Sequence, residues 1–158
     1  MIEPFTKSMR DAVVALSLAA WAPVFESLER AMLPEVYAAF YRGDWRAAQA
    51  AAVAGVCDDS SAHVAVARID GQIAGFVALK VHDDDDMGEI YMIAVDPAWQ
   101  RRGIATGLIQ YALEWLAEAG LSIVMVETGG DPGHGPARAT YEASGFELLP
   151  VARYFKAL

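Results

Sequence analysis

Two arginines, Arg101 and Arg102, stand directly before Gly103 in the segment DPAWQRRGIATG. The chain as a whole carries 21 acidic against 12 basic side chains, a formal charge of -9, so this local positive charge stands out. A glycine between a strand and a helix lets the backbone adopt positive φ, and the first helical turn leaves N–H groups unpaired. Because the helix dipole adds about half a positive charge there, the loop could hold phosphate oxygens. The alternative is that QRRG is a solvated turn, the commoner fate of an isolated basic pair.

The elements on either side of this loop have clear patterns. GEIYMIAVDP is a nearly continuous apolar strand, typical of a sheet centre that is covered on both faces, and Asp96 with Pro97 ends it. The segment after the loop predicts an amphipathic helix that ends at Gly120. Its apolar residues recur every four positions: Ile104, Leu108, Ala112 and Leu116. LSIVMVE predicts a second buried strand, so the two strands are expected to be parallel and joined by a right-handed crossover.

The chain before the central strand divides into a helical part and a hairpin. From about Lys7 to Val56, with Pro23 and Pro34 as breaks, the sequence predicts about three short helices. AHVAVARID and IAGFVALKV then predict two strands joined by a tight hairpin around Asp70 and Gly71. The acidic run DDDD at 83–86 is expected to form the next turn.

After the crossover, Pro136 suits the start of a helix and Gly145 suits its C-terminal cap, which predicts a helix of about nine residues. FELL and VARYFKAL predict closing strands. The sequence therefore predicts a single α/β (α+β) domain over residues 1–158, in which a helical first third precedes a mixed central sheet.

Two motifs connect this layout to a known family. Gln100 to Ala105 match the order Gln/Arg-x-x-Gly-x-Gly/Ala after a strand that ends in IAVDP, and ARATYEASGFELL contains Tyr141 before a Gly145–Phe146 pair. Both motifs resemble those of the GNAT superfamily of acetyl-CoA-dependent N-acetyltransferases. The resemblance covers Gly88 to about Leu149, and it is one of layout only in the first third. It implies a sheet whose parallel central strands splay apart where acetyl-CoA enters.

The resemblance also implies which residues bind the cofactor. The strand with Ile93, Ala94 and Val95 would offer backbone hydrogen bonds to the pantetheine arm. Family members often carry asparagine seven residues before the motif tyrosine, and here that position holds His134, which can also donate to a cofactor carbonyl. The loop would bind the pyrophosphate through Gln100, Arg101, Arg102, Gly103, Ile104, Ala105 and Thr106.

Acetyl transfer to an amine needs a neutral nucleophile, whereas an alkyl ammonium has a pKa of about 10.4 in water. Glu89 occupies the place of a family glutamate that takes this proton, and burial would raise its proton affinity. Tyr141 would protonate the departing CoA thiolate, and a backbone N–H near Val95 would meet the oxyanion. Glu89 as an exposed strand-entry residue and Tyr141 as core packing are the alternatives. We expect His63 and His82 to be surface or packing residues rather than catalysts. Transfer is expected to be direct, in a ternary complex, because Cys57 lies far from both motifs in sequence.

The composition limits the classes of partner that this protein is expected to bind. An acidic chain disfavours nucleic acid and anionic membranes and suits a cationic or neutral acceptor, such as a small-molecule amine or a peptide amine. A single cysteine forms no internal disulfide, no Cys/His cluster has metal spacing, and MRDAVVALSLAAWAPVF continues as a helix rather than as a signal peptide. We therefore expect a cytoplasmic protein without a metal, and a homodimer is possible.

Two other features of the sequence concern alternative functions. GGDPGHG follows a strand and opens a helix, as in dinucleotide-binding proteins, but its glycine spacing is reversed and prolines intrude. A non-catalytic module that binds or senses acetyl-CoA stays open, because cofactor binding and acceptor chemistry use different residues.

Overall fold

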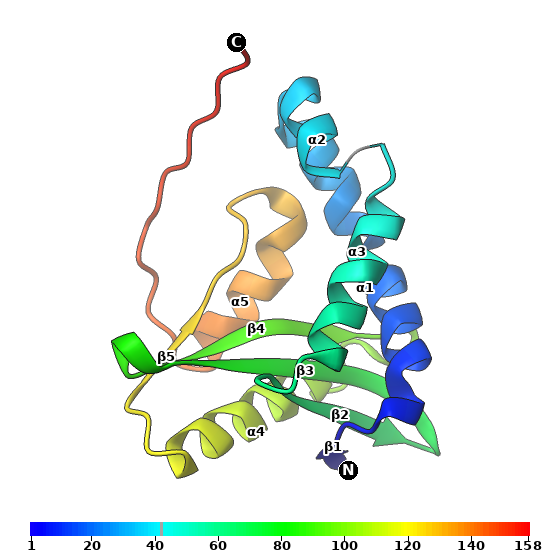
Figure 1. Ribbon diagram of the computed structural model, residues 1–158, viewed down its shortest axis with the longest axis vertical. Coiled ribbons are helices and arrows are strands. Elements are labelled where there is room, and N and C mark those ends of the chain that lie inside the picture. The colour runs from blue at the N-terminus through cyan, green and yellow to red at the C-terminus, as the bar shows by residue number, and fades with distance from the viewer. Residues whose placement is uncertain (42) are drawn as a thin grey trace.

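A computed structural model describes residues 1–41 and 43–158, and these residues contain a five-stranded mixed sheet (Figure 1). The order in the sheet is β1-β2-β3-β4-β5; the first four strands are antiparallel neighbours, and β5 is parallel to β4. The strands are β1 (Ile2–Pro4), β2 (His63–Ile69), β3 (Gln72–His82), β4 (Met87–Val95) and β5 (Ile123–Val126). The expected fold class is confirmed.

Helices cover both faces of the sheet (Figure 1). The helices are α1 (Arg10–Ala31), α2 (Pro34–Tyr41), α3 (Trp45–Asp58), α4 (Ile104–Glu118) and α5 (Gly135–Ala143). On one face, α1 and α3 enclose a core with Phe76 and Ala94. On the other face, α4 and α5 enclose a second core with Leu79, Ile90 and Tyr141. Strand residues therefore alternate between two cores, which explains why the central strands are apolar along their whole length.

The first third forms the three expected helices, but the first of them is not short. Helix α1 spans 22 residues and runs through Pro23. Phe25, beyond the proline, is buried and stacks on Trp45 of α3 with ring centroids 4.3 Å apart. This packing continues on both sides of Pro23, so the proline does not end the helix. By length and composition, residues 7–31 could also cross a membrane, but core helices of globular proteins meet the same test.

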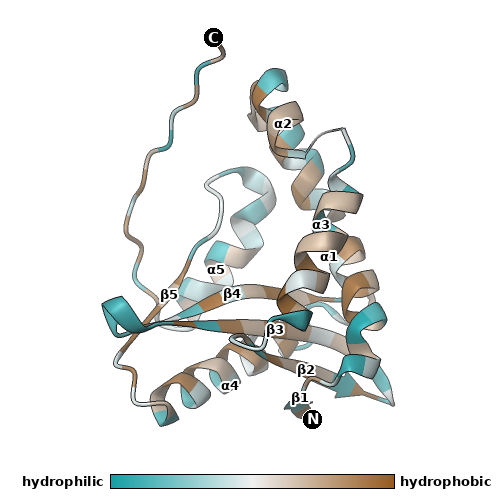
Figure 2. Ribbon diagram, in the orientation of Figure 1, coloured by the Kyte–Doolittle hydropathy of each residue, from teal (hydrophilic) through white to brown (hydrophobic). Residues whose placement is uncertain are grey.

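The hairpin between β2 and β3 forms as predicted, with positive φ at both Asp70 and Gly71. The acidic run also forms a turn, as the 3-10 segment Asp83–Asp85 followed by Asp86 in the left-handed region. Figure 2 shows this turn as a hydrophilic tip beyond the apolar strands. The register between β3 and β4 then shifts: Leu79 pairs with Ile90 and Ala78 with Met92, which leaves Tyr91 as a bulge.

The crossover is confirmed. Helix α4 begins at Ile104, buries Leu108, Ala112 and Leu116, and ends before Gly120, whose φ is +90°. Helix α5 has the expected nine residues, with Gly145 just beyond it at φ +88°.

Two expectations about the end of the sheet were wrong. Strand β5 is not buried; it lies at the sheet edge, and Ile123 is 59% exposed. The expected closing strands are absent from the described residues, because 147–158 contain no helix or strand and run as an extended segment (Figure 1). Its apolar residues Leu148, Leu149 and Val151 are exposed. Pro150 lacks the N–H that a ladder needs, and apolar composition alone supplies no pairing partner. Strand β1, which pairs with β2, was not predicted from the sequence.

Candidate cofactor and acceptor site

The two parallel strands part halfway along β4. Their pairing runs from Met87 opposite Ile123 to Ile90 opposite Val126, where β5 ends. Strand β4 continues for five residues, to Val95, without a neighbour on that side among the described residues. This is the splay that was expected beside the cofactor loop.

The backbone of β4 is open toward this splay at alternate residues. The Asp96 N–H donates to the Ala74 carbonyl of β3 over 2.9 Å, so the backbone of Asp96 points toward β3. Because direction alternates along an antiparallel pair, the N–H and C=O groups of Val95 and Ile93 point the other way, into the splay. Those of Ala94 point toward β3, and its side chain is buried in the α1-side core. Of the three predicted strand contacts, two therefore present backbone groups to the splay.

The loop after β4 leads to an uncapped helix start. Gly103 is the N-cap of α4 at φ +80°, and it has no side chain to bond the first-turn N–H groups. A Cβ added at Gly103 would meet nothing within 4 Å, so the loop is not filled by neighbouring side chains. The N–H groups of Ile104, Ala105 and Thr106 belong to this first turn and have no partner within the helix. Such a helix start suits an anion.

The polar side chains of the loop divide into two groups. Gln100 turns back to β4, where its Nε2 donates to the Val95 carbonyl over 3.1 Å. Arg101, at φ +63°, and Arg102 are exposed, and the Arg102 guanidinium lies 4.9 Å from the Trp99 ring centroid. Both arginines therefore remain available to a ligand at the helix start.

Tyr141 lies in the core on the α4 side of the sheet. It is 9% exposed, packs with the α4-side cluster, and meets Phe146 edge to face with ring centroids 6.0 Å apart. Burial raises the pKa of Tyr141 to about 12, so its phenol keeps its proton at neutral pH. A group of this kind can donate a proton to a thiolate.

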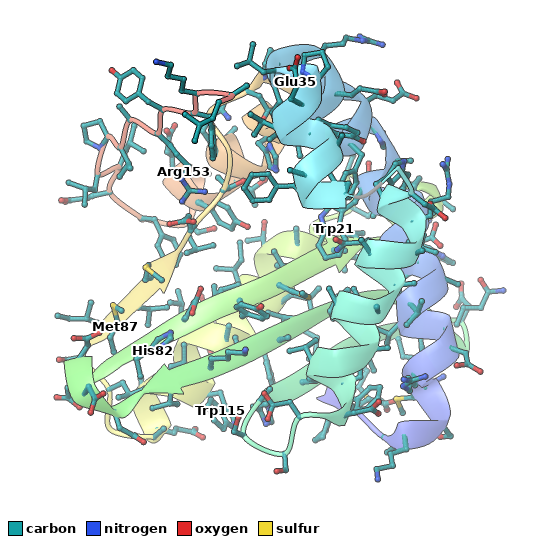
Figure 3. All side chains as sticks on the ribbon, turned by 45° about the horizontal axis from the view of Figure 1, so that its top comes forward. Trp21, Glu35, His82, Met87, Trp115 and Arg153 are labelled. Carbon is teal, nitrogen blue, oxygen red and sulfur yellow. The ribbon has the colours of Figure 1, made fainter. Side chains whose placement is uncertain are left out.

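Glu89 lies on the other face of β4 from Ile90 and therefore from the Tyr141 cluster. Its side chain is 14% exposed, and Oε2 lies 2.5 Å from Nε2 of His82, the last residue of β3. Figure 3 shows His82 on the end of the sheet that α1 does not cover. The two predicted catalytic residues thus lie on opposite faces of β4, and Glu89 lies opposite Met125, in the paired part of β4 just before the splay.

His134 is held by its neighbours. Its Nδ1 is hydrogen-bonded to Asp131, whose other oxygen accepts from the Ser27 hydroxyl of α1 over 2.6 Å. Desolvation would raise the pKa of Asp131, but the hydrogen bonds from Ser27 and His134 outweigh it and hold the pKa below its usual value. Only Nε2 of His134 is left for the predicted cofactor contact.

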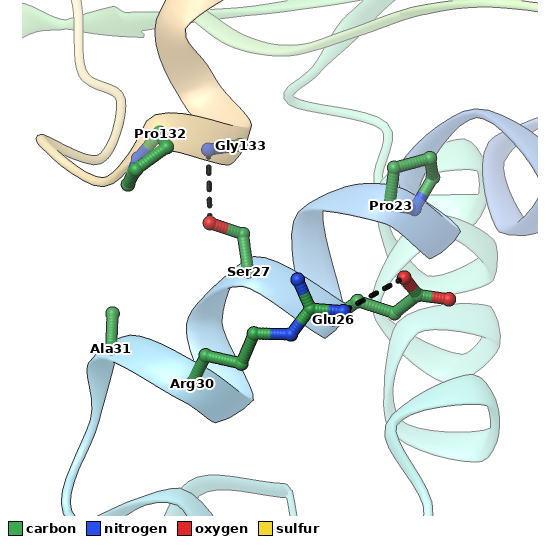
Figure 4. Close-up of a pocket in the computed structure, with 7 residues that line it drawn as sticks. All are labelled: Pro23, Glu26, Ser27, Arg30, Ala31, Pro132 and Gly133. Atoms are coloured by element: carbon green, nitrogen blue, oxygen red, sulfur yellow. Dashed lines mark hydrogen bonds and ion pairs between the residues drawn. The ribbon is translucent and has the colours of Figure 1, made fainter.

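A hollow of about 450 Å³ lies where α1 meets the 3-10 segment Pro132–His134. Figure 4 shows the Gly133 N–H donating to Ser27 Oγ beside this hollow. It is lined by Pro23, Glu26, Ser27, Arg30, Ala31, Pro132 and Gly133. None of the predicted site residues lines it, so we assign it no role.

Sequence reasoning missed two of these contacts and placed His63 correctly. His82 was expected to be a surface or packing residue, but a short turn at 83–86 already implied that it would lie near Glu89 across the hairpin. The Ser27–Asp131 contact joins residues 104 apart, and no local pattern signals it. His63 packs as expected: it stacks on Trp115 with centroids 4.2 Å apart and bonds the Tyr111 hydroxyl.

Comparisons with known proteins agree with this geometry. The chain is 39% identical over 98 residues to the mycothiol acetyltransferase of Thermobifida fusca (strain YX), which covers 58% of this chain and 30% of the relative. The chain thus spans less than a third of the curated relatives it matches.

Two solved structures share the fold. An aminoglycoside antibiotic 6'-N-acetyltransferase from Acinetobacter haemolyticus superimposes with a TM-score of 0.71 at 18% identity, over 100% of this chain and 98% of the other. The ribosomal-protein-S18-alanine N-acetyltransferase from Escherichia coli gives 0.70 at 19% identity, over 95% and 79%.

The sequence profile described as "Acetyltransferase (GNAT) family" matches residues 23–146, most of the chain. The expected family is therefore confirmed, and the expected enzyme class and acetyl-CoA agree with it. The chain belongs to the acetyltransferase (GNAT) family.

Proposed function

We propose that this chain is an acetyl-CoA-dependent N-acetyltransferase that moves an acetyl group directly to a primary amine within a ternary complex. One observation carries the proposal: the open backbone of Ile93 and Val95 adjoins the uncapped start of α4 at Gly103. An extended cofactor arm can hydrogen-bond to the open strand backbone. A pyrophosphate can accept hydrogen bonds from the N–H groups at the start of α4. The N–H of Val95 points into the same space and would bind the oxyanion.

Direct transfer is supported by the state of Cys57. Burial raises the pKa of this thiol to about 11, which keeps it from acting as a thiolate nucleophile at neutral pH. Cys57 lies in the α1-side core. No acyl-enzyme intermediate is therefore needed, and the amine would attack the thioester itself.

The acceptor is proposed to be a small-molecule amine or a peptide amine. The solved neighbours are named for an aminoglycoside and for an alanine of a ribosomal protein, which are amines of both kinds. A chain with a charge of -9 attracts an ammonium acceptor over an anionic one. A homodimer also stays a prediction, and light scattering would test it.

The test is release of free CoA from acetyl-CoA in the presence of a panel of primary amines. Glu89→Gln should lower kcat by roughly 10²- to 10⁴-fold and leave acetyl-CoA affinity unchanged, because the amide cannot take the proton. Glu118→Gln, at an exposed position on α4, is the matched control. If acetyl-CoA binds but no amine is acetylated, the chain is a binding or sensing module instead.

A further inference from the structure

His82 and Glu89 form a contact between two strands that no motif of the sequence assigns. His82 ends β3, Glu89 lies in β4, and the acidic turn between the strands brings them together at 2.5 Å between Nε2 and Oε2. The Glu89 side chain is 14% exposed, whereas that of His82 is 38% exposed. The imidazole thus lies between a largely buried carboxylate and solvent.

The charged groups around this pair are few. On β3, Lys80 lies opposite Glu89, and its ammonium sits 3.8 Å above the ring centroid of Tyr91. The turn after His82 carries the carboxylates of Asp83 to Asp86. On β5, the neighbour of Glu89 is Met125, which is uncharged.

We infer that His82 is a positioning residue for Glu89 that also carries the acceptor's proton from this carboxylate to solvent. The inference rests on the proposed function. Its basis is geometric: the contact with His82 takes up Oε2, and Oε1 has no hydrogen-bond partner among the described residues, so Oε1 would face the amine. The partly exposed imidazole is the group in direct contact with Glu89 that can hand a proton to water.

The proton balance of the reaction requires a route by which a proton leaves Glu89 for solvent. An ammonium acceptor gives one proton to the Glu89 carboxylate and becomes a neutral amine. Its nitrogen forms a bond to the thioester carbon, and the carbon–sulfur bond breaks. The thiolate takes a proton from Tyr141, and the phenolate recovers one from the amide nitrogen. One proton per turnover therefore remains on Glu89. It passes from Oε2 to Nε2 of the His82 tautomer whose proton is on Nδ1. The resulting imidazolium then donates Nε2–H to the Glu89 carboxylate and releases its Nδ1 proton to water, and proton exchange with water restores the first tautomer.

The experiment uses an amine that the wild-type chain acetylates. His82→Gln cannot carry a proton and should lower kcat by about tenfold, while KM and acetyl-CoA affinity stay unchanged. The pH–rate profile of this variant should differ from that of the wild type, because the glutamine side chain takes up no proton from Glu89. His82→Ala should lose as much activity and regain it when free imidazole is added to the buffer.

Asp84→Asn removes a charge from the same turn without touching the contact, and it should leave both the rate and the imidazole response unchanged. Thermal unfolding checks that each variant is folded. Unchanged kcat and pH profile in His82→Gln, or no response of His82→Ala to imidazole, would overturn the relay while the transferase activity stands. A wild-type chain that binds acetyl-CoA and acetylates no amine would overturn both.

Discussion

The Gln100 side chain donates a hydrogen bond to the Val95 carbonyl over 3.1 Å, which ties the loop before α4 to the open end of β4. The contact occupies one backbone acceptor of the splay and leaves the Val95 N–H and the Ile93 groups for a ligand. It also fixes the loop whose next residues form the helix start. Strand and loop are therefore tied together at the place where acetyl-CoA is proposed to bind.

Gln100→Ala should loosen that surface. Loss of the hydrogen bond should cost about 1 kcal/mol, or roughly 2–4 °C in Tm, and acetyl-CoA affinity should fall with it. Gln110→Ala is the matched control, because Gln110 bonds only the exposed Glu114 on α4. Thermal unfolding and calorimetric titration measure both effects. Equal changes in the two variants would contradict the role assigned to the loop contact.

Tyr141→Phe keeps the buried ring and removes the proton donor. We expect the variant to fold and bind acetyl-CoA normally, with kcat reduced by about 10²-fold or more. Because burial raises the pKa of Tyr141 to about 12, the wild-type rate should show no loss from this group up to pH 10. Stopped-flow measurement of the rate as a function of pH would test this expectation. A wild-type rate that falls through the ordinary tyrosine range would remove Tyr141 from this role.

The same shift predicts a change in stability at high pH. The folded pKa of Tyr141 is raised above the unfolded value of 10.0, so its contribution is fully present below pH 10 and is lost as pH rises toward about 12. Denaturant unfolding across that range should show a smaller decline in Tyr141→Phe than in the wild type.

Gly133 is required where α1 meets the segment before α5. A Cβ at this position would lie 2.5 Å from Ser27 Cβ, so Gly133→Ala should force the two elements apart and cost about 1–3 kcal/mol. Gly130→Ala is the control, because a Cβ there meets nothing within 4 Å. Thermal unfolding compares the two; equal Tm values would show that the close approach is not maintained in solution.

The predictions from sequence were correct for the elements that a local pattern of residues determines. The period of four in α4 and the apolar strand before Gly103 were enough to place the loop and the crossover. They failed where contacts between distant parts of the chain determine the structure. The packing of Phe25 on Trp45 lets α1 continue past Pro23. Strand β5 remains at the edge of the sheet because residues 147–158 do not pair with it. The Ser27–Asp131 contact depends on a long-range approach that no local pattern encodes, whereas the short turn at 83–86 already implied that His82 would lie near Glu89.

Thermal unfolding with acetyl-CoA tests the central claim most directly, namely that the helix start at Gly103 holds a pyrophosphate beside the open β4. At one hundred times Kd, acetyl-CoA should stabilise the chain by about 2.7 kcal/mol, or roughly 5–11 °C in Tm. S-acetylpantetheine, which lacks the pyrophosphate, should produce a much smaller shift at the same concentration. An unchanged Tm with acetyl-CoA, or equal shifts with the two compounds, would contradict the account.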